Sequence, residues 1–233
     1  MTEPVWKMIY LARRNPQLSA EEFPQAWREH SALGRQCRNV GERVKSVMQC
    51  SRVLDAGALP GTAQDYDGVN LMQLRDRESA AAIWSDAETL AVMRPDEPRV
   101  FSTYVRDFTL VCREQVLVDG HRGGIGLMGF LRRRADLTPG AFHQAWGGAV
   151  SAGLLMPGPL ALATRVVHNE VVELPPPGYA FDAILECWFD SLEVLRQGFD
   201  SRDLRAQLPA PMGAWLDLPG SVFMLTRVTH SRP

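Results

Sequence analysis

The chain has 233 residues, a formal net charge of −2 and 45% hydrophobic residues, which suits one or two globular domains. This balance offers no basic field for nucleic acid or anionic lipid, and no apolar run approaches the roughly 20 residues that span a bilayer. The first ten residues, MTEPVWKMIY, lack the basic and apolar regions of a signal peptide, so we expect a cytoplasmic protein.

In the first half of the chain, the sequence patterns predict a strand, a helix, two strands, a helix and a strand, over residues 5–12, 19–35, 46–54, 68–75, 77–92 and 100–111. The first helix opens with a capping box, because Ser19 is followed three residues later by Glu22. Residues 113–124 have the composition of a linker.

The second half repeats this order. Its predicted elements cover residues 125–131, a helix from Thr138 onward, and then 163–173, 181–189, 191–207 and 221–229. Thr138 is followed by Pro139, a residue favoured in the first turn of a helix, and Asp190 with Glu193 suggests another capping box. Asp67 and Asp182 precede equivalent strands, where a repeated aspartate usually fixes a turn.

The two halves also match residue by residue. MIYLARRNPQLSAEEFPQAW (8–27) aligns with LMGFLRRRADLTPGAFHQAW (127–146), and the triplet Gln-Ala-Trp recurs. The spacing changes near the end of each half, where 99–105 align with 221–227. The order β-α-β-β-α-β, found twice, is that of the ferredoxin-like unit, whose sheet leaves one face without helices.

We therefore predict an α+β fold in which two ferredoxin-like repeats pack sheet to sheet as a fused, pseudo-dimeric α+β barrel. The first repeat is expected at 1–112, the linker at 113–124 and a diverged second repeat at 125–233.

Residues 7–33, KMIYLARRNPQLSAEEFPQAWREHSAL, resemble the opening of EthD-domain proteins, which belong to the dimeric α+β barrel superfamily. The residues that carry the resemblance are Arg13, Arg14, Pro16, Leu18, Ser19, Phe23, Trp27, His30 and Leu33. The second half matches through Trp146 and then has Ala149 at the place of His30. The resemblance implies the barrel fold, and related barrels include cofactor-free monooxygenases, polyketide cyclases, lactone isomerases and haem enzymes.

His30 is the predicted catalytic residue. It shares one helix face with Phe23 and Trp27, so it is expected to point towards the sheet. A buried histidine is often only a core residue, but Ala149 at the equivalent place indicates that packing does not require an imidazole. Since imidazole titrates near neutral pH, we predict that His30 acts as a general acid or base.

The predicted substrate-binding residues are Tyr10, Trp27, Arg13, Gln49, Tyr66 and His168. Several of these residues could have a structural role instead. Tyr10 could face the inter-sheet core, Arg13 could serve structure or solubility because both halves keep the arginine pair, and His168 could lie in a partly exposed strand.

No metal is predicted, because the cysteines and histidines show no metal-ligand spacing, and the scattered cysteines are expected to be reduced.

The predicted function is a cofactor-independent enzyme, of an isomerase, cyclase, dehydratase or other lyase type or a monooxygenase, acting on an apolar aromatic or polyketide-like compound. The alternatives are a non-catalytic ligand-binding or accessory protein of a degradation or biosynthetic pathway, and haem binding through His30. Nucleotide-binding and serine-hydrolase motifs are absent from the sequence. The expected partner is a small organic ligand, and the sequence leaves open whether two fused barrels pair as a homodimer.

Overall fold

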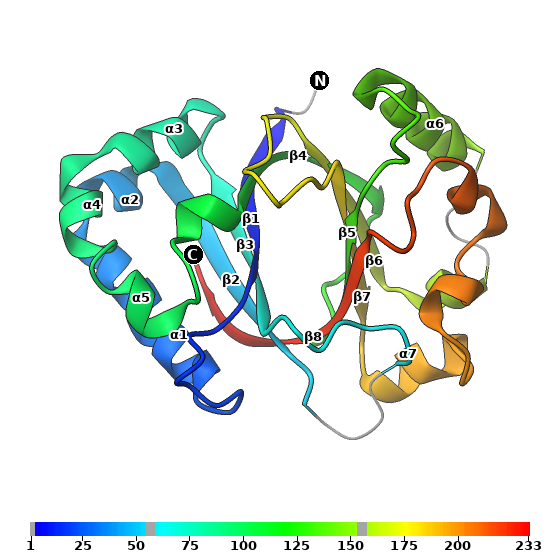
Figure 1. The fold of residues 1–233 in the computed structure, drawn as a ribbon, viewed down its shortest axis with the longest axis horizontal. Helices are drawn as coiled ribbons and strands as arrows, with labels where there is room; N and C mark the ends of the chain where they lie inside the picture. The colour runs from blue at the N-terminus through cyan, green and yellow to red at the C-terminus, as the bar shows by residue number, and fades with distance from the viewer. Residues whose placement is uncertain (1–2, 55–58, 153–157) are drawn as a thin grey trace.

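The computed structural model describes residues 3–54, 59–152 and 158–233. Within these residues the strands form one closed barrel in the order β1-β3-β2-β8-β5-β7-β6-β4 (Figure 1). Every neighbouring pair is antiparallel. The strands are β1 (Val5–Ala12), β2 (Val44–Arg52), β3 (Gly68–Leu74), β4 (Thr109–Val118), β5 (Ile125–Leu131), β6 (Arg165–Val171), β7 (Ala183–Phe189) and β8 (Val222–Arg232).

The helices lie outside the barrel in two groups, one on each flank (Figure 1). The first flank carries α1 (Phe23–Leu33), α2 (Arg38–Arg43), α3 (Glu78–Ser85), α4 (Ala87–Val92) and α5 (Glu97–Val100). The second flank carries α6 (Pro139–Ser151) and α7 (Leu192–Gly198). Short 3₁₀ helices complete the connections: η1 (Gly34–Gln36), η2 (Val105–Phe108), η3 (Gly158–Leu162), η4 (Leu204–Gln207) and η5 (Ala210–Ala214). None of the helices in the described ranges is long and apolar enough to cross a membrane.

Each half of the chain builds half of the barrel. The first half contributes β4-β1-β3-β2 and the second contributes β8-β5-β7-β6, which is the strand order of the ferredoxin-like unit. The halves join where β2 pairs with β8 and where β4 pairs with β6. The predicted α+β barrel is therefore confirmed, with the two sheets facing each other across the interior. The tandem-repeat origin and the domain boundaries stay predictions.

Strand alternation divides the side chains between the barrel interior and the helices. In β1, Ile9 and Leu11 belong to the interior cluster together with Phe130 and Trp188. Tyr10, between them in sequence, belongs to the cluster beneath the first group of helices. The side of the sheet on which a residue lies thus decides whether it can take part in a site under the helices.

A buried charge cluster interrupts the apolar interior. The Nζ atom of Lys7 lies 2.6 Å from Glu186 and 2.5 Å from Glu114. Glu186, which is 0% exposed, also accepts hydrogen bonds from Asn169 at 2.8 Å and from Trp188 Nε1 at 3.1 Å. Burial alone would raise the pKa of Glu186, but the Lys7 ammonium group overrides this effect and lowers the pKa. The contact therefore links β1 to β7 through the Glu186 carboxylate.

Asp67 and Asp182 make the same contact in the two halves. A carboxylate oxygen of Asp67 accepts the backbone N–H of Arg14 at 2.9 Å, and Asp182 accepts that of Arg133 at 2.8 Å. Each aspartate also forms an ion pair with the same arginine. These contacts fix the chain where it leaves the first strand of each half, which agrees with the turn role expected for the aspartates.

The last strand of the first half is misplaced in the prediction. The strand expected over 100–111 is β4, Thr109–Val118, so residues 113–118 of the expected linker are strand. The segment before it holds α5 and η2 instead. The reason is visible in the spacing, because Phe101, Val105 and Phe108 recur at helical intervals and pack beneath α1. The alignment of 99–105 with 221–227 therefore does not match equivalent strands.

The second helix of each half is also shorter than predicted. The helix over 77–92 is divided at Asp86, whose side chain accepts the N–H of Thr89 at 2.8 Å and begins α4. The helix over 191–207 ends at Gly198, as α7. Its N-cap is Ser191, which accepts the N–H of Val194 at 3.2 Å. Asp190 pairs with His121 instead, so the predicted Asp190–Glu193 capping box is wrong.

Candidate active site

The helix α1 presents its apolar face to the outside of the first-half sheet. Ser19 and Glu22 exchange the two hydrogen bonds of the predicted capping box, at 3.1 and 2.8 Å, just before the helix. Phe23, Trp27 and His30 recur at intervals of three or four residues, and all three are buried. The helix face predicted from the sequence is confirmed.

A cavity lies between this sheet and the helices that cover it. Its open space is about 80 Å³. Since one water needs roughly 10–15 Å³ on this measure, the cavity accommodates a small organic molecule. Most of its wall is apolar, formed by Met8, Val40, Met72, Ile83, Trp84, Leu90, Met93 and Val105. Polar groups enter from Tyr10, His30, Ser31, Thr89, Arg94, Glu97, Arg106 and Arg232.

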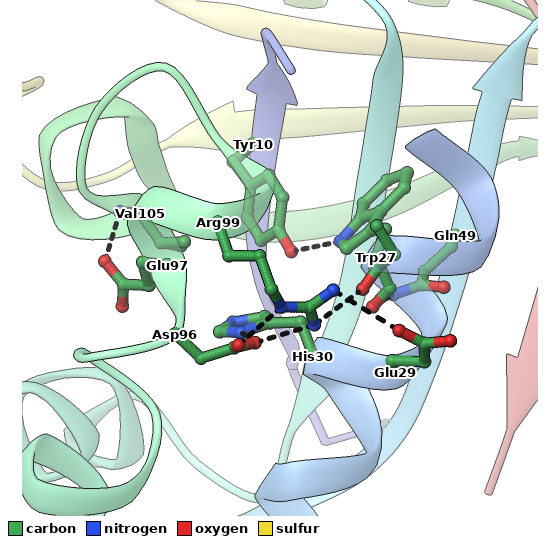
Figure 2. Close-up of polar contacts among 10 residues, drawn as sticks. Tyr10, Trp27, Glu29, His30, Gln49, Asp96, Glu97, Arg99 and Val105 are labelled. Carbon is green, nitrogen blue, oxygen red and sulfur yellow. Dashed lines mark hydrogen bonds and ion pairs between the residues drawn. The ribbon is translucent and has the colours of Figure 1, made fainter. Parts of the chain in front are cut away.

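His30 lies on the wall of this cavity and is 4% exposed. Its Nδ1 atom is 2.9 Å from a carboxylate oxygen of Asp96, just before α5 (Figure 2). Because an ionised carboxylate only accepts hydrogen bonds, the neutral imidazole carries its proton on Nδ1 and keeps a lone pair on Nε2. Within the described residues, the His30 ring has no hydrogen bond other than the one to Asp96.

Burial keeps the His30 ring neutral. Burial lowers the pKa of His30 below its ordinary value of 6.5, although the neighbouring Asp96 acts in the opposite direction. Arg99 donates to both oxygens of Asp96, at 2.7 and 3.1 Å, and these hydrogen bonds lower the pKa of that carboxyl (Figure 2). At pH 7 the site therefore contains a neutral imidazole oriented by an ionised carboxylate.

Tyr10 reaches the same cavity from β1. Its hydroxyl oxygen accepts a hydrogen bond from Trp27 Nε1 at 3.0 Å (Figure 2). Phe101 and Phe108 hold the ring edge to face, at centroid distances of 6.1 and 5.4 Å. Burial raises the pKa of Tyr10, so the phenol keeps its proton at neutral pH. This proton is available to a bound molecule.

Glu97, at the start of α5, supplies the one carboxyl group among the described residues that line the cavity. It is 6% exposed, and it accepts the backbone N–H of Val105 at 2.9 Å. Burial raises the pKa of Glu97. Arg94, Arg106 and Arg232 line the same cavity. The wall is therefore richer in guanidinium groups than in carboxylates.

Two of the predicted site residues, Tyr10 and His30, line this cavity, whereas Trp27 and Gln49 lie behind its wall. Trp27 is 0% exposed and holds the Tyr10 hydroxyl. Gln49 Nε2 donates to the backbone carbonyl oxygen of Trp27 at 3.2 Å. Both residues therefore position α1 and Tyr10. Since neither lines the cavity, neither is placed to contact a substrate there.

Arg13 and Tyr66, which were predicted to bind substrate, lie outside this cavity. The chain leaves β1 at Ala12, which carries Arg13 beyond the sheet. There its guanidinium lies 2.7 Å from Asp65 and stacks 3.9 Å from the centre of the Tyr66 ring. The two residues form an ion-pair and stacking group of their own.

His168, also predicted to bind substrate, lies in the other half of the barrel and does not line this cavity. It belongs to β6 and stacks on Trp146 with a ring-centre distance of 4.4 Å. Burial lowers the pKa of His168 to about 3, and its Nε2 atom is buried without a hydrogen bond. The ring is thus a neutral part of the packing beneath α6.

In the second half, the positions equivalent to His30 and Tyr10 are closely packed. Ala149 is buried in one cluster with Phe142 and Trp146. A side chain at Gly129, the counterpart of Tyr10, would approach the Phe223 ring to 3.1 Å. The second half therefore lacks both the imidazole and the phenol.

The sequence analysis missed Asp96, Glu97 and Arg99, which lie in the run RPDEPR (94–99). The signal for them was two acids before a proline, which favours a helix start, and Pro98 does stand in the first turn of α5. Nothing in the sequence around Arg232 indicated a site residue, because only barrel closure brings it to α1.

Across the described part of the chain, no group of three or more His, Cys, Asp or Glu could hold a metal ion, and the four cysteines are free and buried.

Comparison with solved structures gives the same fold. The chain matches an anthrone oxidase-like protein with a TM-score of 0.63 at 12% identity, covering 99% of this chain and 93% of that one. It matches a candidate monooxygenase from Fusobacterium nucleatum subsp. nucleatum with a TM-score of 0.53 at 8% identity, covering 100% and 95%. A candidate chlorite dismutase matches with a TM-score of 0.51 at 9% identity, covering 98% and 96%. Identities this low show the fold alone.

Sequence comparison adds a family match over part of the chain. No curated protein sequence matches the chain significantly. The family model of the EthD domain matches residues 15–103, the segment that includes α1 with His30, Asp96 and Arg99. Residues 15–103 of this chain are therefore similar to the EthD domain.

Proposed function

We propose that the chain is a cofactor-independent enzyme that uses His30 as a general acid and base on a small, largely apolar compound. The observation that carries the proposal is the His30–Asp96 pair on the wall of a cavity. A neutral imidazole with a lone pair on Nε2 accepts a proton, and the Asp96 carboxylate at 2.9 Å stabilises the imidazolium that results.

Tyr10 supports the same chemistry. Proton removal next to a carbonyl places negative charge on the carbonyl oxygen, and a preorganised donor stabilises that charge. The Tyr10 hydroxyl accepts from Trp27 and so directs its own hydrogen elsewhere. We assign it as the donor to the substrate oxygen. A base and a donor in one apolar cavity suit isomerisation, cyclisation, dehydration or another elimination on an aromatic or polyketide-like compound.

The cavity does not suit haem. A porphyrin needs far more space than the 80 Å³ beside His30, and the apolar wall and the helices α3 to α5 would have to separate to admit one. The remaining alternative is a non-catalytic ligand-binding or accessory protein of a degradation or biosynthetic pathway, which would use the same cavity without turnover.

The test is a screen of aromatic ketones and polyketide-like compounds for binding and for turnover. His30→Ala should retain binding and lose turnover by at least about 100-fold, since general acid–base catalysis typically contributes that much. His143→Ala is the matched control, because His143 lies on α6, outside this cavity, and should leave turnover unchanged. Turnover that survives His30→Ala would contradict the role of His30, and binding without turnover in the unmodified chain would favour the accessory protein.

A further inference from the structure

The first-half cavity receives a side chain from the other end of the sequence. β8 begins beside β5, but its final residues pair with β2, where Arg232 is opposite Val47. The guanidinium extends towards α1, and its Nη2 atom would lie 3.8 Å from a Cβ placed on Gly34, the residue that ends that helix. Arg232 therefore lines the cavity that contains His30.

No residue in the described ranges pairs with this guanidinium. Neither a hydrogen bond nor an ion pair connects Arg232 to any of them, and its Nε atom is buried without an acceptor. By contrast, Arg99 beside the cavity is fully engaged with Asp96. A buried donor without a partner is costly, so the unpaired fork of Arg232 is suited to an acceptor that arrives with a ligand.

The surroundings of Arg232 are positive. Burial and the charge of Arg35 lower the pKa of Arg232, and no acid offsets them. Burial and the positive charges of Arg28, Arg232 and Arg35 lower the pKa of the nearby His230. The partial negative charge at the end of α1 helps to hold a cation there but supplies no hydrogen bond.

Two other charged groups of the cavity wall have contacts of their own. Arg94 lies over the Tyr104 ring at 4.4 Å, and Glu97 is engaged by the Val105 N–H. We propose that Arg232 binds a carboxylate group of the ligand, while the apolar wall holds an aromatic or alicyclic body next to His30. This inference rests on the proposed function of the cavity, and it narrows the ligand class to small carboxylates. A planar guanidinium matches a carboxylate with two parallel hydrogen bonds.

Benzoate and benzamide test the proposal, since they have nearly the same shape and differ in charge. Binding is measured by calorimetry, and the His30 ring signals in NMR locate each compound. The unmodified chain should bind benzoate more tightly than benzamide. Arg232→Gln should weaken benzoate about tenfold or more and leave benzamide unchanged, whereas Arg232→Lys should keep part of the preference. Arg227→Gln, the same change on the exposed part of β8, should have no effect.

Equal affinity of Arg232→Gln and the unmodified chain for benzoate would overturn the proposal, as would binding of neither compound or a preference for benzamide. The proposed function fails in a different way. If a carboxylate substrate binds through Arg232 and is turned over equally well by His30→Ala, the carboxylate site stands and the catalytic role of His30 falls.

Discussion

The Nδ1 atom of His30 lies 2.9 Å from the carboxylate of Asp96, and the segment between the two residues contains β2, β3 and the helices α2, α3 and α4. This contact fixes the orientation of the imidazole and leaves Nε2 as its free nitrogen. Arg99 completes the arrangement, because it binds both Asp96 and Glu29, the residue before His30. The start of α5 therefore holds two neighbouring residues of α1.

The protonation of His30 can be measured directly. Burial lowers its pKa below 6.5, so the ring should stay neutral down to a pH below that value and become charged only in more acidic solution. A reaction that needs the neutral ring should be constant above this pH and decrease as the pH falls through the lowered pKa. NMR titration of the ring provides the value, and a pKa above 6.5 would contradict the account.

Asp96→Asn should lower the pKa of His30 further. The carboxylate raises this pKa at present, and Arg99 would then act on the ring without its counterion. The same NMR titration measures the change. Asp119→Asn is the control, since Asp119 is an exposed partner of Arg165 and should not affect His30. An unchanged or higher pKa in Asp96→Asn would show that Asp96 does not stabilise the charged ring.

Tyr10→Phe should destabilise the fold by about 1–3 kcal/mol, because it leaves the buried Nε1 of Trp27 without an acceptor. Urea unfolding measures the difference. Tyr104→Phe removes the same hydroxyl from a residue that is 39% exposed, and it should change the free energy of unfolding by no more than about 0.5 kcal/mol. Equal effects of the two substitutions would mean that the Trp27 hydrogen bond contributes nothing.

Lys7→Met should destabilise the barrel by about 3–5 kcal/mol at pH 7, since Glu186 would remain buried and unpaired. Because the folded-state pKa of Glu186 is lowered, its contribution is present above the pKa of the unfolded chain, about 4.3, and is lost as the pH falls through the folded-state value. The penalty of Lys7→Met should accordingly be smaller near pH 4, where Glu186 can take up a proton. Adding Glu186→Gln should recover stability at pH 7, and a penalty independent of pH would argue against an ionised pair.

Residues 1–118 expressed alone should form a homodimer or aggregate. This fragment exposes the edges of β2 and β4, which the second half otherwise pairs, and uncovers interior residues such as Ile9 and Leu11. Two copies could pair these edges with each other and close a barrel. Light scattering after size-exclusion chromatography provides the mass, and a stable monomer would contradict the view that each half needs a partner sheet.

The sequence was most informative where apolar patterns are local. The strands 5–12 and 125–131 were predicted to the residue, because these mainly apolar runs end where arginines follow. The face of α1 with Trp27 and His30 followed from its three-and-four spacing. The orientation of Tyr10 was not predictable, since apolar residues lie on both sides of β1 and only packing decides between helices and barrel interior.

Long-range contacts explain the remaining errors. Nothing near Arg232 indicates that the last strand crosses to β2, because this pairing depends on closure of the whole barrel. Asp96 lies in a short segment without periodicity, so its meeting with His30 depends on how α5 packs against α1. His168 shows the reverse case, in which a polar residue that suggested a site belongs to the packing of the other half.

The most direct test of the central claim is a crystal structure of the chain with a compound found in the screen. The account predicts that the compound occupies the cavity beneath α1, with a reacting carbon near Nε2 of His30 and an oxygen near the Tyr10 hydroxyl. A compound that is turned over but binds elsewhere, for example in the pocket lined by Arg113, Glu114 and His168, while the His30 cavity holds only water, would contradict it.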